Sequence, residues 1–172
     1  IINGNNLQLF PMADWHGLET LTISVNDGLM QDSKIITVIV NPVNDAPVLI
    51  SNLDNIIFDE DSSLLVDLFA YDVEGDILNY IISDGGNNNT ISALINYNPL
   101  SVEFSSPLNW SGTEVFTLSV NDGLLVDYTE IVVTVEPVND PPVIISVSPT
   151  EFEASLGYLY SIEALDYDND NL

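Results

Sequence analysis

One stretch of the chain decides the fold, and it reads Phe116-Thr117-Leu118-Ser119-Val120-Asn121-Asp122-Gly123. Its first five residues alternate between apolar and polar side chains, which is the period-2 pattern of a strand with one buried face. The Asn-Asp-Gly that follows predicts a turn, because glycine adopts positive φ without strain and Asn and Asp tolerate it. Ile131, Val133 and Val135 then alternate in the same way. The sequence therefore predicts two strands separated by a turn, with these apolar side chains facing inward.

The same pattern occurs 95 residues earlier in the chain. Over residues 15–50, 21 of 36 positions are identical to the positions 95 residues later. A third, partial copy begins after Asp140 with an offset of 94 residues, so that Ala164 corresponds to Ala70. Repetition at a fixed period indicates an array of similar units. We therefore expect the back part of one unit (residues 1–43), a complete unit (44–138) and the front part of a further unit (139–172), and we expect the two outer parts to be incomplete folds.

The remaining pattern is also that of an all-β protein. Further strands are predicted near residues 47–50, 64–70, 77–82, 91–96 and 100–104, separated by clusters of Asp, Asn, Gly and Ser. No segment has the 3.6-residue apolar stripe of a helix. About seven short strands in about 95 residues are typical of an immunoglobulin-like β-sandwich. Trp15 and Trp110 precede equivalent strands, and we expect them to pack against the core rather than to bind sugars.

Composition excludes several classes of function. The 172 residues include 27 Asp and Glu, one Lys (Lys34) and one His, for a formal net charge of −26. Such a charge repels nucleic acid and anionic membrane surfaces, and no apolar run approaches the roughly 20 residues of a membrane-spanning helix. Carboxylates are almost the only acid–base groups, which disfavours an enzyme. Because 46% of the residues are hydrophobic, the chain is expected to fold around a core.

Many of the acidic residues stand in short runs rather than being scattered. Like charges a few ångströms apart repel by about 1 kcal/mol per pair in water, so a chain that repeats such runs gains by binding a cation. Ca²⁺ prefers six to eight oxygen ligands, whereas Mg²⁺ keeps its waters and is a weaker candidate. Solvated loops are the alternative interpretation. The candidate runs are Asp59-Glu60-Asp61, Asp72-Val73-Glu74-Gly75-Asp76 and Asp166-Tyr167-Asp168-Asn169-Asp170.

Two further features of the runs and linkers have alternative interpretations. The last run resembles the start of an EF-hand loop, but Asn171 replaces the required glycine and no flanking helix is predicted. The linker pairs Asn44-Asp45 and Asn139-Asp140 precede proline-containing dipeptides. Their side chains could bind an ion, or could bond to the local backbone in turns.

These motifs together resemble bacterial cadherin-like tandem repeats. The resemblance rests on the linker Pro-Val-Asn-Asp-Ala-Pro (residues 42–47), on Asn109-Trp110-Ser111-Gly112 leading into the stretch quoted above, and on the closing strand at residues 131–135. It covers the whole chain and implies tandem immunoglobulin- or cadherin-like sandwich domains of about 95 residues. The last partial unit is more similar to the dystroglycan-type cadherin-like variant.

The resemblance implies calcium at the junctions between units. For the first junction it implies Asn44, Asp45, Asp72, Glu74, Asp76, Asp122 and Asp14; for the second it implies Glu60, Asn139, Asp140, Asp166, Asp168 and Asp170. The family's Asp-Arg-Glu motif falls on Asn109-Trp110-Ser111 and on Asp14-Trp15-His16, so its glutamate ligand is absent. One or two ions per junction, or an ion within a domain, fit the sequence equally well.

The first functional hypothesis is a structural or adhesive repeat segment of a large extracellular or cell-surface protein, stiffened by Ca²⁺ at its junctions. Its partners would be neighbouring repeats, identical chains or a ligand on a host or cell surface. The alternative is a carbohydrate- or protein-binding sandwich module of a secreted protein that needs no calcium. A glycosidase-like carboxylate pair is a weak third idea, and adaptation to high salt would explain the acidity without any ion site.

Overall fold

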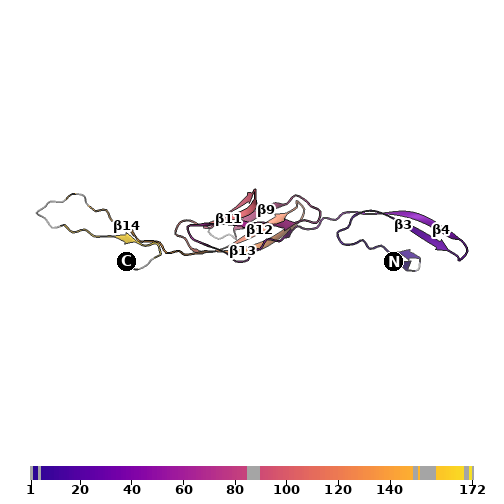
Figure 1. Cartoon of the computed structure of the whole chain (residues 1–172), viewed down its shortest axis with the longest axis horizontal. Helices are drawn as coiled ribbons and strands as arrows, with labels where there is room; N and C mark the ends of the chain where they lie inside the picture. Colours follow the sequence, from indigo (N-terminus) through magenta and orange to yellow (C-terminus); the bar gives the residue numbers. More distant parts are fainter. Residues whose placement is uncertain are drawn as a thin grey trace.

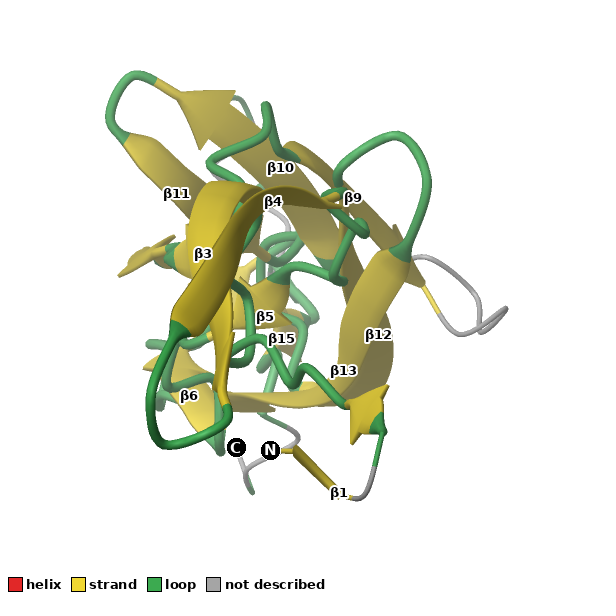
Figure 2. Cartoon of the chain, turned by 90° about the vertical axis from the view of Figure 1, so that its right-hand side faces the viewer, coloured by secondary structure: helices red, strands yellow, loops and turns green. Residues whose placement is uncertain are grey.

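The computed structural model describes residues 2–3, 5–84, 90–148, 151, 158–168 and 171. Three parts follow one another along the long axis of the molecule (Figure 1). We call them the back segment (1–43), the central unit (44–138) and the front segment (139–172); these boundaries stay predictions. Over the described residues the chain consists of strands and loops without a helix (Figure 2), which confirms the all-β prediction. Within the same ranges no helix is long and apolar enough to cross a membrane.

The central unit is built from two main sheets. The four-stranded sheet has the order β6-β13-β12-β9, with the three-stranded sheet β10-β11-β7 opposite it and the short pair β5-β8 beside them. All pairings are antiparallel except that of β6 with β13, which is parallel. The strands are β5 (Val48–Leu49), β6 (Ile56–Asp59), β7 (Ser63–Asp67), β8 (Ala70–Tyr71), β9 (Asn79–Asp84), β10 (Ser92–Tyr97), β11 (Leu100–Ser105), β12 (Gly112–Asn121) and β13 (Val126–Glu136).

The core lies between these two sheets, on the face that the alternating pattern predicts. Leu118, Val120, Ile131 and Val133 are fully buried, and Phe116 is 3% exposed. The ring of Phe116 meets that of Phe104 from β11 edge to face, with centroids 5.5 Å apart. Burying a large apolar side chain contributes roughly 1.5–3 kcal/mol. The burial of this face therefore contributes strongly to the free energy that holds the two sheets together.

Two elements differ from the sequence-based expectation. Strand β6 was not predicted, although Ile56 and Phe58 point into the core and are both 7% exposed. Its alternating run is only four residues long and passes directly into the acidic run at residues 59–61. The strand predicted at residues 64–70 is two strands, β7 and β8, which pair with different partners.

The Trp-Ser-Gly motif has a packing explanation. Trp110 is half-buried and packs against the core, as predicted. A Cβ atom at Gly112 would lie 2.8 Å from the Trp110 ring, closer than side-chain atoms approach one another. The glycine therefore lets the indole lie across the start of β12.

The outer segments repeat parts of this architecture. In the back segment, β3 (Gly17–Asn26) pairs with β4 (Gln31–Val40) in the register that β12 and β13 use, and β1 (Ile2–Asn3) pairs with β2 (Asn6–Leu7). In the front segment, β14 (Val143–Ile144) pairs with β15 (Ala164–Leu165). The predicted inward face of the back segment is uncovered, since Val25 is 67% exposed whereas its counterpart Val120 is buried.

Candidate metal sites at the two junctions

The first junction joins the linker after β4 to the acidic loop after β8. The backbone N–H of Asp45 donates a hydrogen bond to Glu74 Oε2 at 3.2 Å. Asp72 Oδ1 accepts hydrogen bonds from the N–H groups of Glu74 and Asp76, both at 3.0 Å. Gly75 lies within the loop at φ 76°, a conformation that favours glycine. The Asp72 carboxylate thus shapes the loop, and the loop in turn holds the linker.

The other oxygen of Asp72 has no such role. Asp72 is only 6% exposed, and its Oδ2 is buried without a hydrogen-bond partner among the described residues. Buried polar atoms in proteins are nearly always hydrogen-bonded, and leaving one unpaired costs about 1–3 kcal/mol, or more for a charged group. Asp72 Oδ2 is therefore an acceptor oxygen held ready for a donor or a cation.

Asp122 connects the turn of the β12–β13 hairpin to the same linker. Its Oδ1 accepts hydrogen bonds from the N–H groups of Leu124 and Leu125 at 2.6 and 2.7 Å, and its Oδ2 accepts one from Asn44 Nδ2 at 2.8 Å. The Leu125 N–H, the Asn44 amide and the Leu124 N–H hold the pKa of Asp122 below its usual value of 3.8. Asn44 Nδ2 also donates to the Asp45 carbonyl at 3.0 Å. The Asn44 amide nitrogen thus donates two hydrogen bonds, and the Asn44 side-chain oxygen remains as an acceptor for a further donor or a cation.

A cavity of about 270 Å³ lies between the back segment and the central unit at this junction. Asp14 and His16 line it from the back segment, together with Asp45 and Glu74. Asp14 has φ 61°, close to the φ 55° of Asn109 at the equivalent position of the central unit. Three carboxylates and the single histidine of the sequence therefore line one cavity.

The second junction repeats the first. The backbone N–H of Asp140 donates to Asp168 Oδ2 at 2.6 Å, and the N–H of Asp168 donates to Asp166 Oδ1 at 3.0 Å. Asp166 is 7% exposed, much like Asp72. Glu60 reaches the linker from the central unit, where its buried carboxylate accepts a hydrogen bond from the Val138 N–H at 2.7 Å. Linker and acidic loop therefore meet in the same way at both junctions.

Asp140 is the residue whose charge is most opposed at this junction. Its Oδ2 is buried and has no hydrogen-bond partner among the described residues. Partial burial raises the pKa of Asp140 above its usual 3.8, and the negative charges of Asp61, Asp168, Glu60 and Asp166 raise it further. These four carboxylates therefore lie close enough to Asp140 to oppose its negative charge, and a cation beside Asp140 would relieve that repulsion.

Asp61 is a junction residue that the sequence analysis did not assign. Its Oδ1 accepts a hydrogen bond from the Asn109 N–H at 2.8 Å, and its backbone has φ 59°. Asn109 occupies the first position of the motif that is Asp-Arg-Glu in the family that the sequence resembles. Asp61 therefore places a carboxylate next to a position where this chain has an amide instead of the expected Asp. Its place beside Glu60 in an acidic run was the only signal in the sequence.

The structure brings most, but not all, of the candidate residues into contact. Asp76 takes part through its backbone N–H while its side chain is exposed. Among the residues that the structure describes, Asn139 donates only to the Asp140 carbonyl, at 3.2 Å. Asp170 lies outside the described residues. Within the described ranges, no group of three or more His, Cys, Asp or Glu side chains is already arranged to hold a metal ion. Several of these carboxylates bind backbone N–H groups instead.

The fold and the all-strand sandwich define an immunoglobulin-like module. The family model described as bacterial Ig domain matches residues 44–135, so the chain belongs to that family. The immunoglobulin-like part of the sequence-based prediction is thereby confirmed. No protein with a curated description matches the chain.

Several solved structures are similar to parts of the chain. An endo-fucoidan hydrolase of glycoside hydrolase family 107 is 23% identical over 71% of this chain and 19% of its own, with a TM-score of 0.42. The EC1-2 fragment of human protocadherin-24 is 26% identical over 72% of this chain and 61% of its own (TM-score 0.46). The human desmocollin-1 ectodomain is 15% identical over 74% of this chain and 29% of its own, with a TM-score of 0.45. The chain thus spans less than two thirds of each of these structures.

Proposed function

We propose that the chain is a structural or adhesive segment of an extracellular or cell-surface protein, and that calcium at its junctions fixes the angle between neighbouring units. The observation that carries this proposal is an oxygen atom at each junction. Asp72 Oδ2 and Asp140 Oδ2 are both buried, both without a hydrogen-bond partner in the described part of the chain, and both next to a linker that is bonded to an acidic loop.

The available donors favour calcium over other cations. Both junctions offer carboxylate and amide oxygens without a thiol, and hard Ca²⁺ prefers such ligands. The sequence supplies almost no internal counter-charge, because Lys34 is its only Lys or Arg residue and lies exposed on β4. Extracellular calcium modules bind in roughly the 10⁻⁴–10⁻³ M range, which suits a protein that works outside the cell.

Each residue would have a distinct task at the site. Asp72 holds its loop through Oδ1 and would offer Oδ2 to the ion, and Asp140 would offer its own Oδ2. Asp166 accepts the Asp168 N–H and so shapes the second acidic loop. Glu74 and Asp168 now accept the linker N–H groups and would need only side-chain rotation to turn an oxygen inward. Asp122 directs the Asn44 amide so that its oxygen is free. A bound calcium ion would supply the positive charge that joins linker and loop across the junction.

The test is calorimetric titration of calcium into chelator-treated protein, with a melting curve at each end point. We expect saturable binding and a raised melting temperature. Magnesium at the same ionic strength should give neither, which separates binding from charge screening. Asp72→Asn and Asp140→Asn should each remove the binding of one junction, because the amide replaces one charged oxygen with an NH₂ group.

Asp67→Asn is the matched control, since Asp67 is exposed at the end of β7 and is not one of the candidate junction residues. Its titration should equal that of the unmodified chain. Absence of calcium binding, or equal binding by all three variants, would overturn the proposal.

A further inference from the structure

The central unit has an open pocket that the proposed function does not use. It has a volume of about 400 Å³ and lies where the chain leaves β7 and where it enters β11. Its lining includes Asp67, Leu68, Phe69, Tyr80, Pro99 and Leu100. This volume is within the roughly 300–1,000 Å³ of small-molecule pockets. None of the candidate calcium ligands lines it, so the pocket is separate from both junctions.

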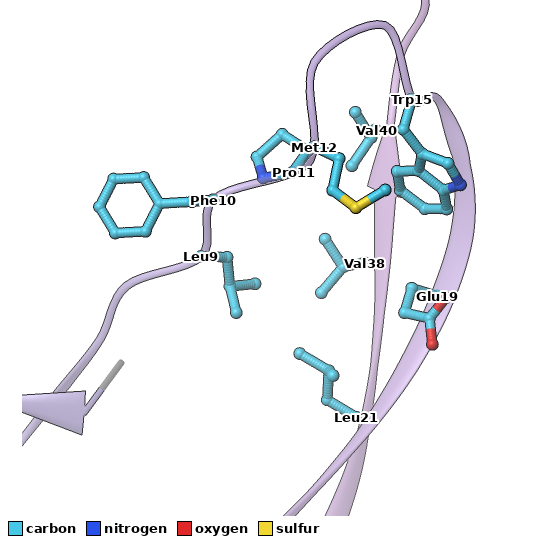
Figure 3. A pocket seen from close by; sticks show the side chains of 9 residues that line it. All are labelled: Leu9, Phe10, Pro11, Met12, Trp15, Glu19, Leu21, Val38 and Val40. Atoms are coloured by element: carbon cyan, nitrogen blue, oxygen red, sulfur yellow. The ribbon is translucent and has the colours of Figure 1, made fainter.

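The groove of about 300 Å³ in the back segment is a different kind of feature (Figure 3). Leu21 and Val38 line it, and their counterparts 95 positions later, Phe116 and Val133, are core residues that are 3% and 0% exposed. Its lining is therefore explained by the core of the repeat, and we assign no ligand to it. The pocket of the central unit lies in a sandwich whose core is covered.

The ring of Phe69 forms an apolar wall of this pocket. The residue is 57% exposed, whereas its backbone is firmly held. Its N–H donates to Ser51 Oγ at 2.6 Å, and its carbonyl accepts hydrogen bonds from the Ser51 hydroxyl at 3.1 Å and from the Ile50 N–H at 3.0 Å. An exposed ring on a fixed backbone is preorganised, which lowers the cost of binding a ligand.

The fold does not require an aromatic residue at this position. In the front segment the N–H of Glu163 makes the equivalent hydrogen bond to Ser146 Oγ, at 3.0 Å. Glu163 therefore corresponds to Phe69, and Ser161, two residues earlier, corresponds to Asp67. The hydrogen bond of the repeat is retained, while the aromatic ring and the carboxylate are specific to the central unit. This difference favours a role for both side chains other than folding.

Tyr80 gives the pocket a hydroxyl group from a buried side chain. The residue is 8% exposed and belongs to the core. Its carbonyl accepts a hydrogen bond from the Tyr97 hydroxyl at 3.2 Å, but its own hydroxyl has no partner among the described residues. Burial raises the pKa of Tyr80 above its usual 10.0, so the hydroxyl keeps its proton at neutral pH. A donor of this kind is stabilised by a ligand that accepts its hydrogen bond.

Asp67 supplies an acceptor beside this donor. It is exposed at the end of β7, and its carboxylate accepts no hydrogen bond within the described part of the chain. The pocket thus joins an aromatic face, a hydroxyl donor and a carboxylate acceptor. A pyranose sugar matches all three, because its C–H face packs on an aromatic ring and its hydroxyl groups both donate and accept hydrogen bonds.

Other classes of ligand match the pocket less well. The net charge of −26 repels anionic ligands. An organic cation would suit Phe69 and Asp67 but offers no acceptor to the Tyr80 hydroxyl. A polyproline peptide offers ring faces and carbonyl acceptors but no N–H donor to Asp67.

We propose that this pocket binds a pyranose ring of a neutral glycan, stacked on Phe69 and hydrogen-bonded to Tyr80 and Asp67. The inference goes beyond the proposed function, because the pocket lies within one unit and needs no calcium. Binding of this kind would attach the segment to a neutral polysaccharide.

NMR titration of the isotope-labelled chain in chelator tests the proposal. The probes are cellotetraose, xylotetraose, mannotetraose and galactotetraose. We expect at least one of them to shift the amide signals of Phe69 and Leu100 in a saturable manner. Absence of a saturable shift with all four would overturn the proposal. Tighter binding of a proline hexapeptide or of choline at the same signals would also overturn it, because the ligand would then belong to another class.

Two variants test the assignment to this pocket. Phe69→Ala should weaken binding about tenfold or more, since aromatic anchors carry much of the affinity of a site. Tyr80→Phe removes only the hydroxyl and should weaken binding about three- to tenfold, the usual effect of one hydrogen bond. Its melting temperature should not fall, because the hydroxyl has no partner in the described part of the protein. A lowered melting temperature would mean that the hydroxyl serves the fold and would count against the proposal.

Tyr128→Ala is the matched control. Tyr128 is an exposed aromatic residue on β13 (70% exposed) that does not line the pocket. This variant should bind the sugar like the unmodified chain. Unchanged affinity in Phe69→Ala or Tyr80→Phe, or an equal loss in Tyr128→Ala, would show that the sugar does not bind in this pocket.

Discussion

At the scale of single residues, the aspartates of this chain act first as acceptors for the backbone. Asp72 Oδ1 closes the acidic loop, while Asp122 and Asp27 close equivalent turns in two units. Such carboxylates are stabilised in their charged form by N–H donors. An ion can bind only those carboxylate oxygens that do not already accept backbone N–H groups. For this reason the unpaired Asp72 Oδ2 is stronger evidence for a site than the number of acidic residues nearby.

The pKa values of Asp27 and Asp122 provide a matched pair for testing this account. Backbone N–H groups lower both below 3.8, and Asp122 has an additional donor in Asn44. The stability that these carboxylates contribute is therefore present above pH 3.8 and is lost as the pH falls through their lowered folded-state pKa values. In Asn44→Ala, NMR titration should show the pKa of Asp122 moving upward while that of Asp27 stays unchanged. An unchanged pKa of Asp122 in Asn44→Ala would show that the hydrogen bond from Asn44 is not formed in solution.

At this scale, the sequence named the linker pairs and the alternating acids as candidates, and the structure places several of them in contact at the junctions. Their binding of an ion stays a prediction. Asp61 stood in a candidate run, but its place at the junction could not be predicted, because it depends on a backbone turn at φ 59° and on a contact with Asn109, which is 48 residues away in sequence. Long-range contacts of this kind leave no periodic signal.

At the scale of elements, one buried carboxylate ties β12 to the start of β10. Glu114 is 7% exposed, and its two oxygens accept the N–H groups of Thr90 and Ile91 at 3.0 and 3.1 Å. These two strands lie in different sheets, so Glu114 fixes one sheet against the other. Periodicity predicted the strands themselves, but a charged residue at a buried strand position runs against that pattern.

Glu114→Gln tests this connection between the sheets. The amide keeps one acceptor oxygen and turns an NH₂ group toward the second N–H, so two donors face each other. We expect a loss of about 1–3 kcal/mol in the free energy of unfolding, which is the usual cost of an unsatisfied buried polar group, measured by urea denaturation. Glu130→Gln, exposed on β13, should change it by less than about 0.5 kcal/mol. Equal effects of the two substitutions would contradict the structural role of Glu114.

The elements that the sequence did not reveal share a physical cause. Strand β6 and the division between β7 and β8 involve short segments whose partners are distant in the chain. A four-residue strand holds only two inward positions, too few for alternation to stand out. Long strands such as β12 and β13 could be predicted because each has at least three buried side chains at alternating positions.

At the scale of the whole molecule, the two junctions decide how the units are oriented. In each, a short linker is hydrogen-bonded to one acidic loop, and a buried carboxylate oxygen without a partner in the described ranges belongs to the loop or the linker. Under the proposed function, repulsion between these groups would favour a range of angles when no cation is bound. A cation between linker and loop would favour one angle and would make the units a stiff rod.

Pulsed electron paramagnetic resonance can measure this stiffness, since the sequence has no cysteine and spin labels can be placed at will. Labels at Leu29→Cys and Leu108→Cys span the first junction, and both positions are exposed, by 94% and 78%. We expect a broad distance distribution in chelator that narrows when calcium is added. The control pair, Leu108→Cys with Leu124→Cys, lies within the central unit and should give one narrow distribution in both conditions. A spanning distribution equally broad with and without calcium, in protein shown to bind the ion, would mean that calcium does not set the angle between the units.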